Sequence, residues 1–419
     1  MKINIEQLKC IRTLLTSLAD DNIDAEWDGF LNDEDDNDLP DEIELDEIRL
    51  SFPDDQDYCH ISPDDFLLYM NDIASIRRVG DTIVRTNHIV QAVISSSRMG
   101  YTGFESELSL FSFVGEGLTA SVVKMPFLVG VMNAHEGRYS EDFGFGACEP
   151  YTAIEIRLTE EKDEEYLKNL IEQICFYLTD KIGVAIYPWE GPDINELYNR
   201  MDEYYDETDE SEKDVNEDTA IEVKMLPPYS PLLKMFRQAK GVDDPEIQFL
   251  QYYKIIEYVS PVVAKLVAYD HLNRRLDLLP SVNRNFKYLD SILDVARKYD
   301  KDLRDDSLAE AVIVNCVDVV PLYEFLPQRM LKKVKGELKL QKDVLTDIDV
   351  NEEQVRGLQH KIATILYATR NSIVHAKSNY EETGNELSLD ELEEGNRILE
   401  VIVRSIINWN QRQAEGFRL

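Results

Sequence analysis

The residue pattern of this 419-residue chain changes near residue 230, and that change limits the chain to two domains of different classes. Before it, short runs rich in β-branched and aromatic residues recur, and one of them, 151–158, alternates as a half-buried strand does. After it, apolar residues recur at steps of three and four, the spacing of a helix that buries one face. We therefore expect an α+β N-terminal domain and an all-α C-terminal domain.

The N-terminal domain is predicted to span residues 1–200 and to contain a mainly antiparallel sheet with helices. Ser62 and Pro63 are residue types that cap and begin a helix, Thr159 is expected to cap a later one, and Gly183 to end it. Helices are predicted over 4–18, 62–76 and 159–182. Strands are predicted over 43–50, 82–95, 108–113, 118–123, 127–132, 151–158 and 184–187.

Acidic residues are concentrated in the first half of the chain. Residues 1–229 hold 52 Asp and Glu against 17 Lys and Arg, whereas residues 230–419 hold 30 against 27. The formal net charge of −38 therefore belongs almost entirely to the first half, where it opposes nonspecific nucleic-acid binding and favours either solubility or a basic protein partner. The acidic run 202–218 and the prolines after it predict a linker over 201–231.

The C-terminal domain, residues 232–419, is expected to be a bundle of helices. Pro245 opens the first, and Pro261 is expected to kink this helix or to restart a second one. Further helices are predicted over 282–299, 306–317, 329–342, 354–380 and 389–411.

The helix predicted over 354–380 carries the most concentrated chemistry of the chain. Away from its core face lie Arg370, Asn371 and His375, and the last two are neighbours on the helix surface because they are four residues apart. The residues of the core face recur at three- and four-residue steps: Ile362, Ile365, Leu366, Thr369, Ile373 and Ala376.

The stretch from Arg370 to His375, Arg-Asn-Ser-Ile-Val-His, resembles the Arg-polar-x-x-x-His motif of HEPN domains. The aromatic-rich stretch 249–258 resembles the first helix of many of these domains, which are all-helical, often dimeric and often ribonucleases. The resemblance covers about the last 180 residues and implies a metal-independent endoribonuclease with a composite site at a homodimer interface. It implies Arg370, Asn371 and His375 as the catalytic residues.

These residue types match what RNA cleavage without a metal requires. Histidine accepts and donates protons near neutral pH, arginine offers a charged fork that fits phosphate oxygens, and asparagine orients the imidazole or donates to phosphate. Glu257 and Tyr367 are expected to support the site, and Tyr367 and Val374 suit a dimer seam. An Arg and a His on an exposed helix face are also common as ordinary solvated surface, so that interpretation stays open.

Other candidate sites lack the residues that their chemistry needs. His60 beside Cys59 has no partners for a zinc site, and His135 has no second histidine four residues on. Asp142-Phe143-Gly144 follows no kinase catalytic loop and is interpreted as a turn, and His360 as surface. We therefore expect no metal and no cofactor.

Five scattered cysteines, no apolar run of membrane-spanning length and no signal-peptide pattern lead us to expect a cytoplasmic protein with no membrane association. Two functions remain. The first is a regulated toxin or anti-phage defence effector that cuts RNA, with the acidic domain sensing a protein trigger. The alternative is a non-catalytic, HEPN-like dimerisation protein whose acidic N-terminal domain binds a protein partner.

Overall fold

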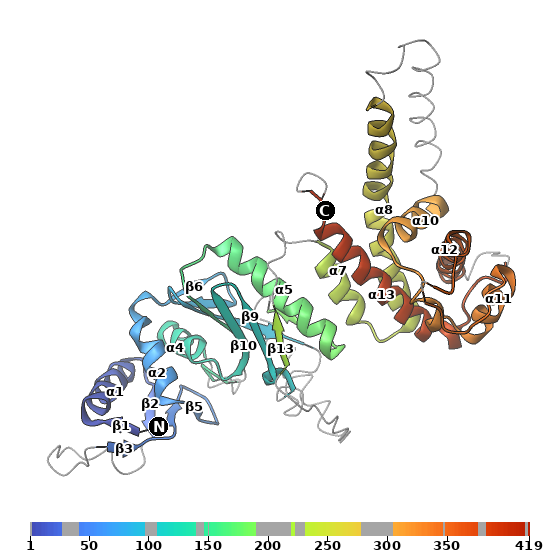
Figure 1. Cartoon of the computed structure of the whole chain (residues 1–419). Helices are drawn as coiled ribbons and strands as arrows, with labels where there is room; N and C mark the ends of the chain where they lie inside the picture. Colours follow the sequence, from blue (N-terminus) through green and yellow to red (C-terminus); the bar gives the residue numbers. More distant parts are fainter. Residues whose placement is uncertain are drawn as a thin grey trace. The chain divides into compact units, whose positions relative to one another are not determined.

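The chain was analysed as a computed structural model, in which the described residues form two compact units, Met1–Pro228 and Tyr229–Leu419 (Figure 1). The first contains antiparallel sheets with helices and the second is all-helical, which confirms the predicted fold classes. Each unit is described by itself. The described residues are 2–26, 42–96, 107–139, 146–149, 151–189, 219–222, 231–277, 305–346, 348–375, 383–414 and 418–419.

The main sheet of the first unit has the strand order β13-β9-β10-β11-β8-β7-β6 in the described residues, with β12 paired to β8 (Figure 1). Its pairs are antiparallel except for β13 with β9. The strands are β6 (Arg77–Val79), β7 (Ile83–Arg85), β8 (Ile89–Ser95), β9 (Phe111–Gly115), β10 (Leu118–Lys124), β11 (Thr152–Leu158), β12 (Tyr187–Pro188) and β13 (Thr219–Glu222).

Strand β13 lies inside the segment that was predicted to be a linker. It pairs in parallel with β9, so the first unit extends beyond the predicted boundary at residue 200. Ile221 packs against the core of this unit. The strand is only four residues long and follows an acidic run, so its Thr219–Ile221 alternation is too short to stand out in the sequence.

Two hydrophobic clusters cover the two faces of the main sheet. On β8, Val90 and Ala92 belong to one cluster and Ile89 and Val93 to the other, as the alternation of a strand requires. Helix α5 (Glu164–Ile182) covers the first face, and α1 (Ile5–Leu18), α2 (Pro63–Asn71) and α4 (Phe127–Glu136) contribute to the second (Figure 1).

Helix α4 replaces the strand that was predicted over 127–132. A short apolar run does not distinguish a buried strand from a buried helix, and this helix buries most of its residues. The side chain of Gln91 accepts hydrogen bonds from the amides of Leu128 (2.8 Å) and Val129 (3.2 Å), which satisfies the first turn. Gly137, with φ of 65°, ends the helix in the left-handed conformation.

The start of α5 was also misplaced. Asp163 caps it, since its carboxylate accepts a hydrogen bond from the Tyr166 amide at 2.8 Å, whereas the Thr159 hydroxyl donates to the Gly117 carbonyl. Gly183 ends the helix as predicted, with φ of 82°. Sequence identifies good capping residue types, but it does not decide between two of them four residues apart.

The predicted helices at 4–18 and 62–76 are α1 and α2. Ser62 caps α2 as predicted, accepting from the Asp65 amide at 3.1 Å, but α2 ends at Asn71, and a 3₁₀ turn, Ile73–Ser75, leads into β6. The strand predicted over 43–50 is two strands in two small sheets. These sheets contain β1 (Lys2–Asn4) with β3 (Glu42–Glu44), and β2 (Asp24–Glu26) with β4 (Ile48–Ser51) and β5 (Cys59–Ile61).

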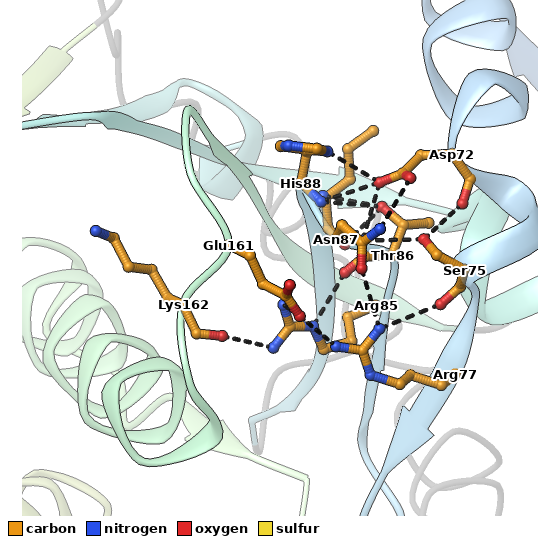
Figure 2. Close-up of polar contacts among 10 residues, drawn as sticks. Asp72, Ser75, Arg77, Arg85, Thr86, Asn87, His88, Glu161 and Lys162 are labelled. Carbon is orange, nitrogen blue, oxygen red and sulfur yellow. Dashed lines mark hydrogen bonds and ion pairs between the residues drawn. The ribbon is translucent and has the colours of Figure 1, made fainter.

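The strand predicted over 82–95 is a hairpin of β7 and β8, turned at residues 86–88 (Figure 2). The carboxylate of Asp72 accepts from the amides of Asn87 (2.9 Å) and His88 (3.1 Å), and from the His88 ring at 3.1 Å. Burial raises the pKa of Asp72, but hydrogen bonds from His88, Thr86 and Ser75 outweigh it and lower that pKa. This carboxylate fixes the turn against the end of α2.

Arg85, beside the same turn, is almost completely buried. Its guanidinium donates to the backbone carbonyls of Thr86 (3.0 Å) and Lys162 (2.8 Å), and it shares the Glu161 carboxylate with Arg77 (Figure 2). Since these donors meet acceptors, the cluster joins the β7–β8 hairpin to the loop before α5.

The second unit consists of helices. α8 packs against α7, α10 and α13, and α12 packs against α10, α11 and α8. Its elements are α7 (Pro231–Lys240), α8 (Pro245–Leu276), α10 (Asp305–Cys316), α11 (Gln328–Leu338), α12 (Glu352–His375) and α13 (Leu392–Gln411), with 3₁₀ turns at Tyr323–Phe325 and Leu389–Glu391.

Three details of the second unit differ from the predictions. α7 was not predicted, because its region was assigned to the linker and the start of the domain. α8 continues through Pro261 for 32 residues, so of the two expected effects of this proline, a kink or a restart, the restart is excluded. α11 ends at Leu338 rather than at residue 342. The predicted helix 282–299 and the predicted end of the motif helix at 376–380 lie outside the described residues.

Candidate functional site

The Arg–His motif lies on α12, whose core face positions it. Ile362, Ile365, Leu366 and Thr369 are buried, as predicted, and Ile373 is half-buried. A buried polar group requires a partner, and the Thr369 hydroxyl donates to the Ile365 carbonyl (2.8 Å) and accepts from the Leu387 amide (2.9 Å). That second bond fixes the segment before α13 to α12 one residue before Arg370, a link that sequence analysis missed.

Arg370 contacts two of the other predicted site residues. Its Nη2 lies 3.1 Å from Oε1 of Glu257 on α8, and its Nη1 donates to Oδ1 of Asn371 at 3.2 Å. The Arg370 side chain is 28% exposed and that of Glu257 is 48% exposed. The structure therefore brings together residues that are more than a hundred positions apart in the sequence, at the edge of the packed helices.

His375 and Tyr367 lie on the same part of α12. His375 is exposed and follows Asn371 by one turn of the helix. Tyr367 is half-buried and precedes Asn371 by one turn. Val374 is 48% exposed, so it lies off the core face of α12.

The site can bind an anion, because its cation is accessible. An ion pair in which both side chains are partly exposed contributes roughly 0–1 kcal/mol and is readily exchanged. A phosphate oxygen can therefore replace the Glu257 carboxylate on the Arg370 fork without loss of the fold. The arrangement offers a guanidinium, a carboxamide and an imidazole within about one and a half helical turns.

The histidines that sequence analysis rejected as site residues lie in surface pairs. His60 contacts Glu47 at 3.0 Å, His135 contacts Asp21 at 3.0 Å, and His360 contacts Glu310 at 3.1 Å; all three rings are more than half exposed. Asp142 to Gly144 lies outside the described residues. Within the part of the chain that is described, no His, Cys, Asp and Glu side chains form a group of three that could hold a metal ion.

A second polar centre lies in the first unit, around the buried carboxylate of Glu155 on β11. It accepts hydrogen bonds from Tyr69 (2.6 Å), Gln91 (2.7 Å) and Arg157 (2.8 Å). Burial, followed by the charge of Glu155, raises the pKa of Tyr69, so that hydroxyl stays protonated as a donor. Both carboxylate oxygens are occupied by the protein itself, which makes this centre structural.

Comparison with known proteins identifies no relative. No protein-family model matches the chain, and neither the curated proteins nor the solved structures contain a match to it. In the described residues, no helix is both long enough and apolar enough to span a membrane.

Proposed function

We propose that this protein is a metal-independent endoribonuclease of the HEPN type. The observation that carries the proposal is the contact of Arg370 with Asn371 and Glu257, at an exchangeable surface position, with His375 exposed one turn further on. Arg370, Asn371 and His375 lie off the buried face of α12, and Glu257 reaches Arg370 from α8. They have the residue types that phosphate binding and proton transfer require.

In the proposed reaction, His375 removes the proton from a ribose 2′-hydroxyl, and the 2′-oxygen attacks the adjacent phosphorus. Arg370 stabilises the negative charge that develops on the phosphate oxygens. The bond from phosphorus to the 5′-oxygen breaks, and this oxygen takes a proton from a second donor. The products are a 2′,3′-cyclic phosphate and a 5′-hydroxyl end.

A second donor is the reason for proposing a homodimer. One motif holds one imidazole, which acts as base or as acid but not as both in one step. A two-fold axis brings the same surface of two copies together, so a second His375 supplies the proton. Val374, 48% exposed beside the motif, gives such a seam an apolar contact. Light scattering on the full chain at micromolar concentration is expected to give twice the 48.4 kDa of one chain.

The acidic first unit is proposed as the regulatory part of a toxin or anti-phage effector in the cytoplasm. Residues 1–229 carry 52 acidic against 17 basic residues, a charge that repels RNA and attracts a basic protein trigger. Solubility alone also explains that charge. The two explanations differ in whether a basic partner changes the cleavage rate.

The test is cleavage of RNA by the purified full chain in EDTA, compared with His375→Ala. General acid–base catalysis contributes typically 10²- to 10⁴-fold, so His375→Ala is expected to lower the rate at least about 100-fold. His360→Ala is the matched control, because His360 is an exposed histidine of the same helix that pairs with Glu310. Equal cleavage rates for the His375→Ala and His360→Ala variants would show that His375 takes no part in the reaction.

The second candidate function is a non-catalytic dimerisation protein. The observation in its favour is that Arg370 already has protein partners in Glu257 and Asn371, as a purely structural arginine has. In that case Arg370→Ala lowers the stability of the dimer, and no purified preparation cleaves RNA.

A further inference from the structure

The most basic stretch in this acidic chain surrounds α11. Residues 328–342 contain six Lys and Arg and a single acidic residue, Glu337, in a chain of net charge −38. The sequence alone assigned no function to this stretch and showed only that the C-terminal domain as a whole is nearly neutral. Its position in the fold shows which of the cations are available to a ligand.

Helix α11 (Gln328–Leu338) buries one side and leaves lysines on the other. Met330, Leu331 and Val334 are buried. Lys332, Lys335 and Lys339, three and four residues apart, lie opposite them, and we name these three residues the lysine stripe. Lys332 and Lys339 are exposed, and Lys335 pairs with Asp343 at 2.6 Å. Seven residues of helix span about 10 Å, so the stripe presents cations along a line.

The other two cations of α11 are used inside the unit. Arg329 pairs with Glu391 at 2.7 Å, and Lys333 donates to the Gly384 carbonyl (2.9 Å) and to the Asn385 side chain (2.7 Å). They hold the segment whose Leu387 amide bonds Thr369 of α12. Lys332 on α11 and Lys339 directly after it are therefore the exposed cations of this stretch whose side chains make no described hydrogen bond or ion pair inside the unit.

α11 also lies beside the motif helix, on the side that leads to His375. Gln354 donates to the Leu338 carbonyl at 3.2 Å, Lys361 pairs with Glu337, and Gly357 has no Cβ where the Leu338 side chain approaches. Steps of three and four residues continue this line of α12, positions 354, 357 and 361, to Asn371 and His375. α11 thus packs along the N-terminal part of the helix that carries the motif at its C-terminal end, and the stripe lies on the outer side of α11 in the same unit.

We propose that the lysine stripe binds the phosphate backbone of the RNA that the motif cleaves. This inference rests on the proposed ribonuclease function and names a part of its substrate-binding surface. Lysine ammonium groups are point charges that contact phosphates without reading bases, so the contact is independent of sequence. It also offsets locally the repulsion between a chain of net charge −38 and a polyanion.

The test is binding of a labelled single-stranded RNA to the full chain by fluorescence anisotropy, across a salt series, in a His375→Ala background that prevents cleavage. Lys332→Gln with Lys339→Asn removes the two exposed charges of the stripe and leaves Lys335, which pairs with Asp343. Asparagine tolerates the left-handed backbone of Lys339, whose φ is 52°. The matched control, Lys168→Gln with Lys181→Gln, removes the same charge from exposed positions of α5.

Each phosphate contact on a single strand contributes about 0.7 to the slope of log K against log salt, so the stripe variant is expected to lower that slope by about 1.4. Its affinity near 0.1 M salt is expected to fall about tenfold or more, with the control unchanged. Equal affinities and slopes for the two variants would overturn the inference, and so would a parent chain that does not bind RNA.

Two further outcomes distinguish this inference from binding of an acidic protein segment and from RNA binding without cleavage. Polyglutamate that competes for the stripe as strongly as RNA of equal charge would assign the surface to an acidic protein segment instead, which overturns the proposed ligand. A chain with intact His375 that binds RNA through the stripe but never cleaves it would support the RNA-binding surface and contradict the proposed ribonuclease function.

Discussion

Two carboxylate–guanidinium pairs in this molecule differ in what surrounds them. In the first unit, Glu155 and Arg157 meet in the sheet, with the Glu155 side chain 1% exposed and bonded also by Tyr69 and Gln91. Arg157 is 41% exposed and also pairs with Asp65 at 2.8 Å. In the second unit, Glu257 and Arg370 meet at the edge of two helices, 48% and 28% exposed.

That difference separates a structural pair from a candidate site. A buried carboxylate must have all its hydrogen bonds made by the protein, and once made they leave no position for a ligand. A half-exposed pair is worth little to the fold, so its partners can be exchanged for an external anion. The burial and complete bonding of the carboxylate partner, rather than the residue types, therefore distinguish the two pairs, and the exposed Glu257 supports Arg370 as the proposed anion-binding arginine.

The largest expected effect is on stability, at Glu155. Glu155→Ala leaves the buried donors Tyr69 and Gln91 without their acceptor, and each unsatisfied buried donor costs about 1–3 kcal/mol. The 41% exposed Arg157 keeps Asp65 as a partner at 2.8 Å. Glu160→Ala, at a 79% exposed position that faces Lys162 at 3.7 Å, is the control and is expected to change stability by less than about 0.5 kcal/mol. Calorimetry of the first unit's transition measures both; equal shifts would contradict the structural assignment.

Arg370 is expected to show the opposite balance. Arg370→Ala removes the phosphate-binding fork and is expected to lower RNA cleavage about 100-fold, while it changes the free energy of unfolding by less than about 1 kcal/mol. Asn371→Ala is expected to act in the same direction with a smaller loss. The rate and the melting temperature are measured on the same preparation. Ile365→Asp buries a charge on the core face of α12 and is expected to unfold the second unit, so it is the reference for a loss of activity that is caused by unfolding.

The sequence was most informative where a pattern depends on local chemistry. The core face of α12 follows from three- and four-residue spacing, and the Ser62 cap from residue type, so both were predictable. Phe127–Glu136 was not, because its apolar residues fit either a buried strand or a buried helix, and the side chain of Gln91 that satisfies its first turn is 37 positions away.

The site was predictable in its residue types but not in its contacts. Arg370, Asn371 and His375 stand out by spacing on one helix, and Glu257 was expected to support them, but its contact with Arg370 depends on the packing of α8 against α12. β13 shows the same limit in the first unit, because its pairing with β9 bridges more than a hundred residues of chain. Contacts of this kind arise from tertiary packing, which periodicity does not encode.

A smaller effect is expected at Glu257, and it sharpens the contrast with Glu155. Glu257→Gln removes a negative charge that holds one edge of the Arg370 fork, so RNA binding in the His375→Ala background is expected to strengthen about threefold to tenfold. The fold loses less than about 1 kcal/mol, because the pair is partly exposed. Weaker binding by Glu257→Gln would instead make Glu257 a positioning residue for the guanidinium. Glu246→Gln, on the first turn of the same helix, is the control for charge alone.

The smallest expected effect concerns Asp55, a carboxylate that is less buried than Glu155 and less exposed than Glu257. Its Oδ1 accepts from the amides of Cys148 and Glu149, both at 3.1 Å, while its Oδ2 is buried with no hydrogen-bond partner in the described structure. Burial raises the pKa of Asp55 from 3.8 to about 6, against the effect of those two amides. The folded state therefore binds this proton more tightly than the unfolded state.

It follows that the contribution of Asp55 to the free energy of unfolding falls as pH rises from about 4 through the folded pKa of about 6, and it levels off only once the carboxyl group is fully ionised. Asp55→Asn keeps an acceptor for the two amides and removes the titration. The variant is expected to be more stable than the parent at pH 7 by about 1 kcal/mol, a value reduced for the partial exposure of the group, and equally stable near pH 4. Urea unfolding at pH 4, 5, 6 and 7 measures the difference. A gap that does not change with pH would mean that Asp55 titrates alike in both states.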